Sequence, residues 1–293
     1  MAPDSAFAAA FEHVAANLRS AGCVFAEDEA RLLLSAFPSP ADRGDAVLRR
    51  MSGIPLEHLL GWAGFCGLRI AVDPGVFVPR LRTGLLVREA VAALQTSLAP
   101  GTSRGRYDAG LPPVVVDLCC GSGAVGAAVA AAVGASSGGV TEPSFGVAGI
   151  ELHAADVDPA AVSCARKNIV PVGGQVHQGD LFSALPAHLR GRVRVLAVNA
   201  PYVPTEAIST MPPEAREYES HAALDGGTDG LDFHRRLASE APEWLEPGGC
   251  IIVETSGGQA ARTAELLAAA GFSTRTVQSG ELDGTVVVGS WPG

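Results

Sequence analysis

Residues 114–123 read VVVDLCCGSG, and this stretch decides the fold. Its three valines predict a buried strand that ends near Asp117, and its two glycines predict a tight turn into a helix over 124–133. Short apolar runs and helical patterns alternate from here to the C-terminus. Such alternation predicts an α/β fold, in which a mainly parallel sheet carries helices on both faces.

The same pattern defines the elements of the C-terminal part. Strands are predicted over 114–117, 147–155, 175–177, 193–198, 249–254, 273–277 and 285–288, and helices over 124–133, 159–169, 230–241 and 259–270. A glycine- and serine-rich segment, 134–146, predicts a surface insertion. Ligands bind at the carboxyl ends of the strands in such a sheet, so the residues after each strand are the candidates for a site.

The first hundred residues are organised differently. Apolar residues at helical spacing predict helices over 5–36, 42–51 and 55–60, and short alternating runs predict a β-hairpin over 62–79. A helix over 83–98 and a linker over 100–113 follow. The predicted domains are a small helical domain over 1–61, a hairpin, helix and linker over 62–112, and an α/β domain over 113–293.

Composition and charge exclude several classes of protein. The 293 residues are 47% hydrophobic, which is ample for a large core, and the net charge of −10 argues against binding nucleic acid through its phosphates. The six cysteines show no C-x-x-C pair and no metal-ligand spacing, so we expect reduced thiols in the cytoplasm and no metal. No apolar stretch has the length of a membrane span, so we expect no membrane association.

Four residues after the predicted strand 193–198 indicate a reacting site. Asn199 offers a side-chain oxygen and Ala200 a main-chain carbonyl. Pro201 rigidifies the loop, and Tyr202 offers a flat ring for stacking. Two acceptors beside a ring suit a planar nitrogen, such as an amide or an amino group, and these four residues are the predicted catalytic set. The alternative is an ordinary Asn-Pro loop.

The glycine turn predicts a cofactor that contains a nucleotide. Residues 121–126 match G-x-G-x-x-G, so a nicotinamide site is one alternative, and a turn without a ligand is another. Two features favour S-adenosylmethionine instead. One is Asp117, four residues before the first glycine, and the other is the set of residues 199–202, which we call the clamp because it would hold a nitrogen. Asp156 is the candidate for the ribose hydroxyls and Asp180 for the adenine amino group, although either side chain could simply cap a helix. The predicted cofactor-binding residues are Asp117, Cys119, Gly121, Gly123, Asp156, Val157, Asp180, Leu181, Phe182 and Asn199.

Methyl transfer from a sulfonium to nitrogen explains why such a clamp is needed. The sulfur, carbon and nitrogen must lie nearly in line, so positioning supplies much of the rate. An amide nitrogen is a poor nucleophile, because its lone pair is delocalised into the carbonyl. If the Asn199 oxygen and the Ala200 carbonyl each accept one N–H, they favour the positive charge that develops as the lone pair turns toward the methyl group.

These motifs together resemble the protein-(glutamine N5) methyltransferases, the family that modifies glutamine in peptide-chain release factors and one ribosomal protein. The resemblance rests on residues 55–61, 78–80, 117–123, 156–159, 179–182, 199–202 and 223–231. It implies a class I, Rossmann-like S-adenosylmethionine methyltransferase with a seven-stranded, mostly parallel sheet and a helical N-terminal domain for substrate recognition. It also implies that Asn199 and Tyr202 grip a glutamine, while Gly121, Asp156 and the surroundings of Asp180 hold the cofactor. We also expect a monomer.

Several departures from the family pattern concern the substrate. Ala200 stands where the clamp usually has its first proline, and residues 81–84 read LRTG where the family has a proline, an acid, a threonine and a glutamate. Residues 282–285 read LDGT where the family often has an Asp-Arg pair. A methyltransferase of a small-molecule amide, amine or guanidine therefore stays open, as does a cofactor-binding protein without turnover. An adenine N6-methyltransferase is disfavoured by the acidic charge.

A Gly-Gly-Gln tripeptide leads from the predicted strand 249–254 into the predicted helix 259–270. Residues 257–259 read GGQ, the sequence that release factors present for methylation. Here it follows a predicted strand and begins a predicted helix, so we interpret it as a turn rather than as a site of automethylation.

Overall fold

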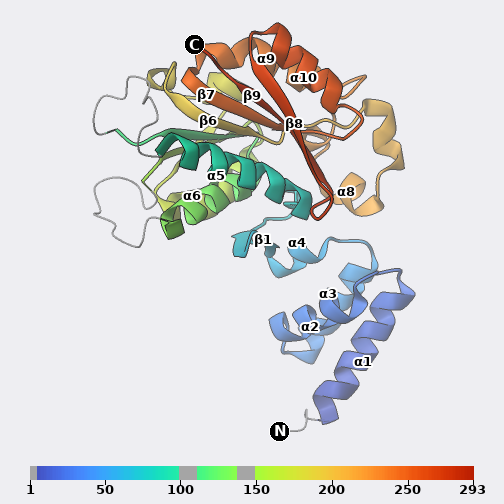
Figure 1. Ribbon diagram of the computed structural model, residues 1–293. Coiled ribbons are helices and arrows are strands. Elements are labelled where there is room, and N and C mark those ends of the chain that lie inside the picture. The colour runs from blue at the N-terminus through green and yellow to red at the C-terminus, as the bar shows by residue number, and fades with distance from the viewer. Residues whose placement is uncertain (1–4, 99–110, 137–148) are drawn as a thin grey trace.

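The computed structural model describes residues 5–98, 111–136 and 149–293. Its first part is a helical unit that stands apart from the sheet in Figure 1 and contains α1 Ser5–Ser20, α2 Ala26–Ala36, α3 Pro40–Met51 and α4 Leu56–Leu60. Leu18 and Leu33 are completely buried between these helices. The side chain of Ser39 accepts a hydrogen bond from the Asp42 N–H, and this N-cap fixes where α3 begins.

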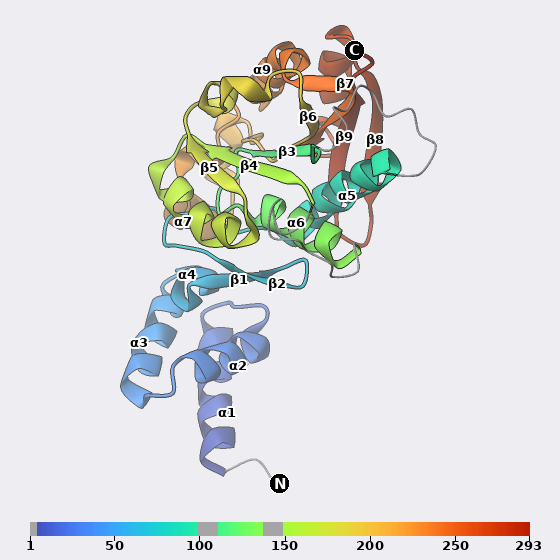
Figure 2. The ribbon, with the colours of Figure 1, turned by 90° about the vertical axis from the view of Figure 1, so that its left-hand side faces the viewer.

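A β-hairpin connects the helical unit to the main sheet. Its strands, β1 Trp62–Phe65 and β2 Leu68–Ala71, pair antiparallel. The two turn residues, Cys66 and Gly67, have φ angles of 48° and 77°, and positive φ at both positions is the mark of a type I′ hairpin turn. Figure 2 shows the hairpin between the helical unit and the sheet.

The main sheet has seven strands in the order β5-β4-β3-β6-β7-β9-β8. All neighbouring strands pair in parallel except β9, which is antiparallel to both β7 and β8. The strands are β3 Val114–Leu118, β4 Glu151–Asp156, β5 Gln175–Gln178, β6 Val193–Val198, β7 Leu245–Glu254, β8 Ser273–Ser279 and β9 Gly284–Ser290. The prediction of a seven-stranded, mostly parallel α/β sheet is confirmed.

Helices cover both faces of this sheet. They are α5 Gly84–Leu98, α6 Ala124–Ser136 and α7 Pro159–Ile169 on one face, and α9 Asp232–Glu240 and α10 Ala260–Ala269 on the other. Val115 of β3 packs into the core under the first group, whereas Val114 and Val116 pack into the core under the second. Every residue of β3 is therefore buried, and each such valine contributes about 1.5–3 kcal/mol by leaving water.

Some helices and strands begin or end at other residues than predicted, because the hydrophobic pattern of the sequence does not show backbone angles. The helix predicted from residue 230 begins at Asp232, because Gly230 has a φ of 74°, which a right-handed helix does not adopt. Most of the predicted linker over 100–113 and of the predicted insertion over 134–146 lies outside the described residues. Among the described helices, none is long and apolar enough to cross a membrane.

The order of the strands positions the site. β4 and β5 lie on one side of β3, and β6 and the remaining strands lie on the other. At such a switch point the loops after neighbouring strands diverge, which leaves a crevice at the carboxyl edge of the sheet. The turns after β3, β4 and β6 meet at this edge.

Candidate active site

A pocket with a volume of about 400 Å³ opens at the carboxyl ends of β3, β4, β6 and β7. The predicted site residues that line it are Asp117, Cys119, Gly121, Asp156, Val157, Asp180, Leu181, Asn199, Ala200, Pro201 and Tyr202. The structure therefore brings both predicted sets of residues to one pocket. Gly123 and Phe182 are not among its lining residues.

The glycine turn after β3 is shaped by Asp117. This side chain is only 2% exposed, and its Oδ2 accepts a hydrogen bond of 2.8 Å from the Gly126 N–H in the first turn of α6. Burial raises the pKa of Asp117 to about 8, against the effect of the Gly126 N–H. Gly123 has a structural role instead of a pocket role, because its φ is 76° and an added Cβ would lie 2.7 Å from Ile169.

Asp156 connects the turn after β3 to the turn after β4. Its Oδ2 accepts from the Gly121 N–H at 2.8 Å, and its Oδ1 accepts from the Asp158 N–H at 3.0 Å. Burial raises the pKa of Asp156, although both N–H groups oppose the rise. The neighbouring Asp158 is the N-cap of α7, and its side chain accepts a hydrogen bond of 2.8 Å from the Ala160 N–H.

The turn after β5 differs in part from the prediction. Asp180 lines the pocket and forms two hydrogen bonds of 2.9 Å with Arg236 of α9. Leu181 also lines the pocket, with a positive φ of 46°. Phe182 was predicted to bind the cofactor, but it is 2% exposed and stacks on Trp244 with ring centroids 5.8 Å apart. Phe182 therefore belongs to the core beneath the pocket, and of these two residues Leu181 is the one that lines the pocket.

The clamp begins where β6 ends. Asn199 lines the pocket, and its Nδ2 lies 3.5 Å from Thr83 Oγ1 and donates to it. The Asn199 Oδ1 has no hydrogen-bond partner among the described residues and stays available as an acceptor. Ala200 and Pro201 are buried from bulk solvent and still line the pocket. Tyr202 is half-buried beside them, so the two predicted acceptors and the ring share one wall.

Comparison with known proteins identifies the family. No family model matches the chain. The release factor glutamine methyltransferase of Geobacter sulfurreducens is 35% identical over 228 residues, which cover 77% of this chain and 69% of that protein. The chain belongs to the release factor glutamine methyltransferase family. The 4-amino-L-phenylalanine/4-methylamino-L-phenylalanine methyltransferase of Streptomyces pristinaespiralis is 34% identical, over 80% of this chain and 73% of that protein.

A solved structure agrees on the fold of this family member. The 16S rRNA N2 G1207 methyltransferase of T. thermophilus superimposes with a TM-score of 0.50 at 18% identity, over 78% of this chain and 49% of that one. At this identity the likeness concerns the class I methyltransferase fold alone.

Two buried polar residues stand behind the clamp of this family member, and sequence reasoning gave neither a role. Glu254, the last residue of β7, is 2% exposed and accepts a hydrogen bond of 3.5 Å from the Tyr202 hydroxyl through Oε1. Its Oε2 is buried without a partner among the described residues. Burial raises the pKa of Glu254 to about 7 and that of Tyr202 to about 12. Thr83, the partner of Asn199, is also 2% exposed.

Arginine side chains line the pocket near the clamp. Arg80 donates to both carboxylate oxygens of Glu219 at 2.8 Å. Burial raises the pKa of Glu219, and the charge of Arg80 opposes the rise. Arg82 is exposed and lines the same pocket, and its charge opposes the rise that burial causes in the pKa of Tyr202 and of Glu254. This positive side chain stands where the family usually has an acid.

Proposed function

We propose that the protein transfers a methyl group from S-adenosylmethionine to the side-chain amide nitrogen of a glutamine in a protein, with a peptide-chain release factor as the substrate. One observation carries the proposal: Asn199 and Tyr202 line the same pocket as Gly121. A glycine turn alone suits many nucleotides, whereas a clamp for a planar nitrogen beside it suits few reactions. The names of relatives at 35% identity support the choice of substrate.

The pocket residues fit this cofactor. Asp156 accepts one N–H on each carboxylate oxygen, and each oxygen keeps a second lone pair for a ribose hydroxyl. Val157, which is 56% exposed, and Leu181 give the pocket apolar walls for adenine. Asp180 offers its carboxylate to the adenine amino group while Arg236 fixes its orientation. When bound, the cofactor supplies a methyl group activated by its sulfonium.

The clamp prepares the substrate nitrogen. The Asn199 Oδ1 and the Ala200 carbonyl accept its two N–H groups, and the ring of Tyr202 packs on the plane of the amide. Thr83 accepts a hydrogen bond from the Asn199 amide nitrogen, so the amide oxygen is the atom of Asn199 that remains to accept an N–H of the substrate. Such fixed acceptors stabilise positive charge on nitrogen more than mobile water does, since they need no reorganisation during the reaction.

Incubation with labelled S-adenosylmethionine and purified release factors tests the proposal. We expect label on a glutamine of the release factor. Asn199→Ala should lower kcat by about 100-fold or more, because one of the two acceptors is lost, while the dissociation constant of S-adenosylhomocysteine changes less than about threefold. Asn199→Asp keeps an acceptor oxygen and should retain more activity. Absence of label on every release factor would refute the proposal that a release factor is the substrate. A wild-type kcat for Asn199→Ala would refute the role of Asn199 as a hydrogen-bond acceptor for the substrate nitrogen.

A second candidate is a methyltransferase of a small-molecule amide, amine or guanidine. Arg82 in the pocket wall favours it, because an exposed guanidinium suits a substrate with a carboxylate, and the name of the relative from Streptomyces pristinaespiralis describes an amino acid substrate. In the same labelling experiment, 4-amino-L-phenylalanine and glutamine serve as competing acceptors. Label in the small-molecule fraction alone would favour this candidate.

We further propose that the helical unit over residues 1–61 recognises the protein substrate. Pro55 and Glu57 belong to this unit and line the pocket. We also place the protein in the cytoplasm, as a monomer that does not bind nucleic acid. The six free cysteines and the charge of −10 support this placement.

A further inference from the structure

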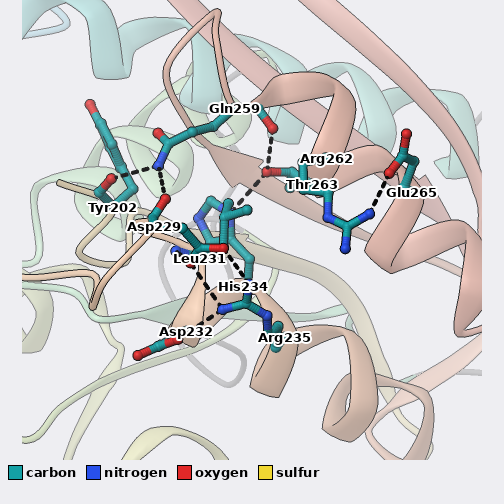
Figure 3. A network of polar contacts seen from close by, with 10 residues as sticks. All are labelled: Tyr202, Asp229, Leu231, Asp232, His234, Arg235, Gln259, Arg262, Thr263 and Glu265. Carbon is teal, nitrogen blue, oxygen red and sulfur yellow. Dashed lines mark hydrogen bonds and ion pairs between the residues drawn. The ribbon is translucent and has the colours of Figure 1, made fainter. Parts of the chain in front are cut away.

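Gln259 lies directly behind the clamp, although it is 57 residues away in sequence. Its side-chain Nε2 donates to the main-chain carbonyl of Tyr202 at 2.9 Å and to that of Asp229 at 3.1 Å, as Figure 3 shows. Its Oε1 accepts from the Ser256 hydroxyl at 2.7 Å. Both donors and the acceptor of this amide are therefore used, so its orientation is fixed and its nitrogen is not presented to a methyl donor.

The loop that carries Asp229 packs against the back of the clamp without side chains between them. An added Cβ at Gly230 would lie 2.3 Å from both the Tyr202 carbonyl and the Gln259 Nε2. At Gly226 it would lie 2.8 Å from the Pro201 carbonyl and from the Tyr202 Cα. The two backbones are so close that one side-chain amide can bridge a carbonyl of each.

The bridge itself rests on a rigid element. Gln259 precedes the first residue of α10, and its main-chain carbonyl accepts from the Thr263 hydroxyl at 3.1 Å. Thr263 in turn bonds to the ring of buried His234 at 2.9 Å. Tyr202 is thus held at both ends from the segment 254–259, by Glu254 at its hydroxyl and by Gln259 at its carbonyl.

We propose that Gln259 is a positioning residue for methyl transfer: one N–H of its side-chain amide holds the Tyr202 carbonyl and the other holds the Asp229 carbonyl. This bridge fixes the backbone of Tyr202, and thereby the ring and the Ala200 carbonyl that face the nitrogen of the substrate. The inference rests on the proposed function. A misplacement of about 1 Å can lower a rate by about 100-fold, so loss of this bridge acts mainly on kcat.

Three variants test the donors separately from the bulk of the side chain. Gln259→Glu keeps the shape but replaces the two donors with an acceptor, and Gln259→Met keeps the volume without any donor. Arg262→Ala, in the first turn of α10, is the matched control, since Arg262 is exposed and bonds only to Glu265 among the described residues. For both Gln259 variants we expect kcat to fall by about 10- to 100-fold, with the dissociation constant of S-adenosylhomocysteine within about threefold of wild type.

Hydrogen exchange keeps the test independent of the substrate. Peptides that cover 199–205 should exchange faster in both Gln259 variants and at the wild-type rate in Arg262→Ala. If wild type methylates nothing offered but exchange rises as expected, the proposed function fails and the positioning of the clamp stands. A wild-type kcat in Gln259→Met, unchanged exchange over 199–205, or equal losses of kcat and cofactor affinity with a lower Tm would each overturn the inference.

Discussion

At the residue scale, the environment of Glu254 is the least expected from sequence. A carboxyl group that is 2% exposed, with one oxygen bonded to Tyr202 and the other unpartnered among the described atoms, is strongly disfavoured in its charged form. Its pKa of about 7 means that it is largely protonated at pH 6 in the folded protein. The hydroxyl of Tyr202 therefore sits beside a group whose charge changes near neutral pH.

Glu254→Gln should remove a dependence of stability on pH. The folded pKa of Glu254 lies above its ordinary value of 4.5, so the native state binds more protons than the unfolded state between about pH 4.5 and 7. Stability from this group is present below pH 4.5 and is lost as pH rises to 7. Between pH 4.5 and 7.5 the free energy of unfolding of Glu254→Gln should therefore rise by about 2–3 kcal/mol relative to wild type. Urea unfolding at both pH values measures this, and a constant difference would contradict it.

At the element scale, the glycine turn shows what a pattern can and cannot predict. The valines of β3 and the glycines after it predicted a strand, a turn and a helix in their observed places. The pattern did not distinguish the roles of Gly121, which lines the pocket, and Gly123, which packs under α7. That difference depends on Ile169, more than forty residues away, and only the folded chain brings it near.

The two glycines allow a matched pair of substitutions. Both have positive φ, 54° for Gly121 and 76° for Gly123, so alanine is strained at either position by about 1 kcal/mol. At Gly123 the new Cβ would also lie 2.7 Å from Ile169, whereas at Gly121 its nearest neighbour would be 4.0 Å away. Gly123→Ala should therefore destabilise the protein by about 1–3 kcal/mol more than Gly121→Ala in urea unfolding without cofactor. Equal losses would show that Ile169 moves aside freely.

Contacts between residues far apart in the sequence also explain which other parts of the site could not be predicted. The positions of the clamp residues and of the acids at the ends of β4 and β5 could be predicted, because each lies at or just after the carboxyl end of a strand, and these ends reach one edge of the sheet. Glu254 is the last residue of β7 and Gln259 follows that strand, but their contacts with Tyr202 depend on β7 lying next to β6. Phe182 was wrongly assigned to the cofactor site because it packs on Trp244, a residue far along the chain that only the folded structure brings near.

At the scale of the whole molecule, Arg50 joins the helical unit to the catalytic part. Its side chain is 7% exposed and bonds to Glu29 of α2 at 2.6 and 3.1 Å. It also bonds at 2.6 Å to Glu214 of α8 Pro213–Tyr218, whose residues line the pocket. The hydroxyl of Tyr218 donates to the Ser52 carbonyl at 3.1 Å and adds a second connection. The unit proposed for recognition is thus linked to the wall of the pocket by specific polar contacts.

Arg50→Met and Glu214→Gln should differ sharply in stability. Arg50→Met leaves Glu29 buried without its cation, which costs about 3–5 kcal/mol. Glu214 is 47% exposed, so Glu214→Gln should cost less than about 1 kcal/mol, because a solvated pair contributes little. Chemical unfolding of both variants measures the difference. Equal losses of unfolding free energy would show that the buried pair of Arg50 with Glu29 contributes no more to stability than the exposed pair with Glu214.

The strands at the two ends of the sheet have a consequence for association. β5 has only four residues, and β8 is mostly exposed and contains Arg275, which pairs with Glu89 at 2.7 Å. Long, flat, apolar edge strands pair with strands of other molecules, whereas short or charged edge strands oppose such pairing. Extension of the sheet by a strand from a second copy of the protein is therefore disfavoured at both edges. Concentrated solutions of the protein should accordingly resist fibrillar aggregation.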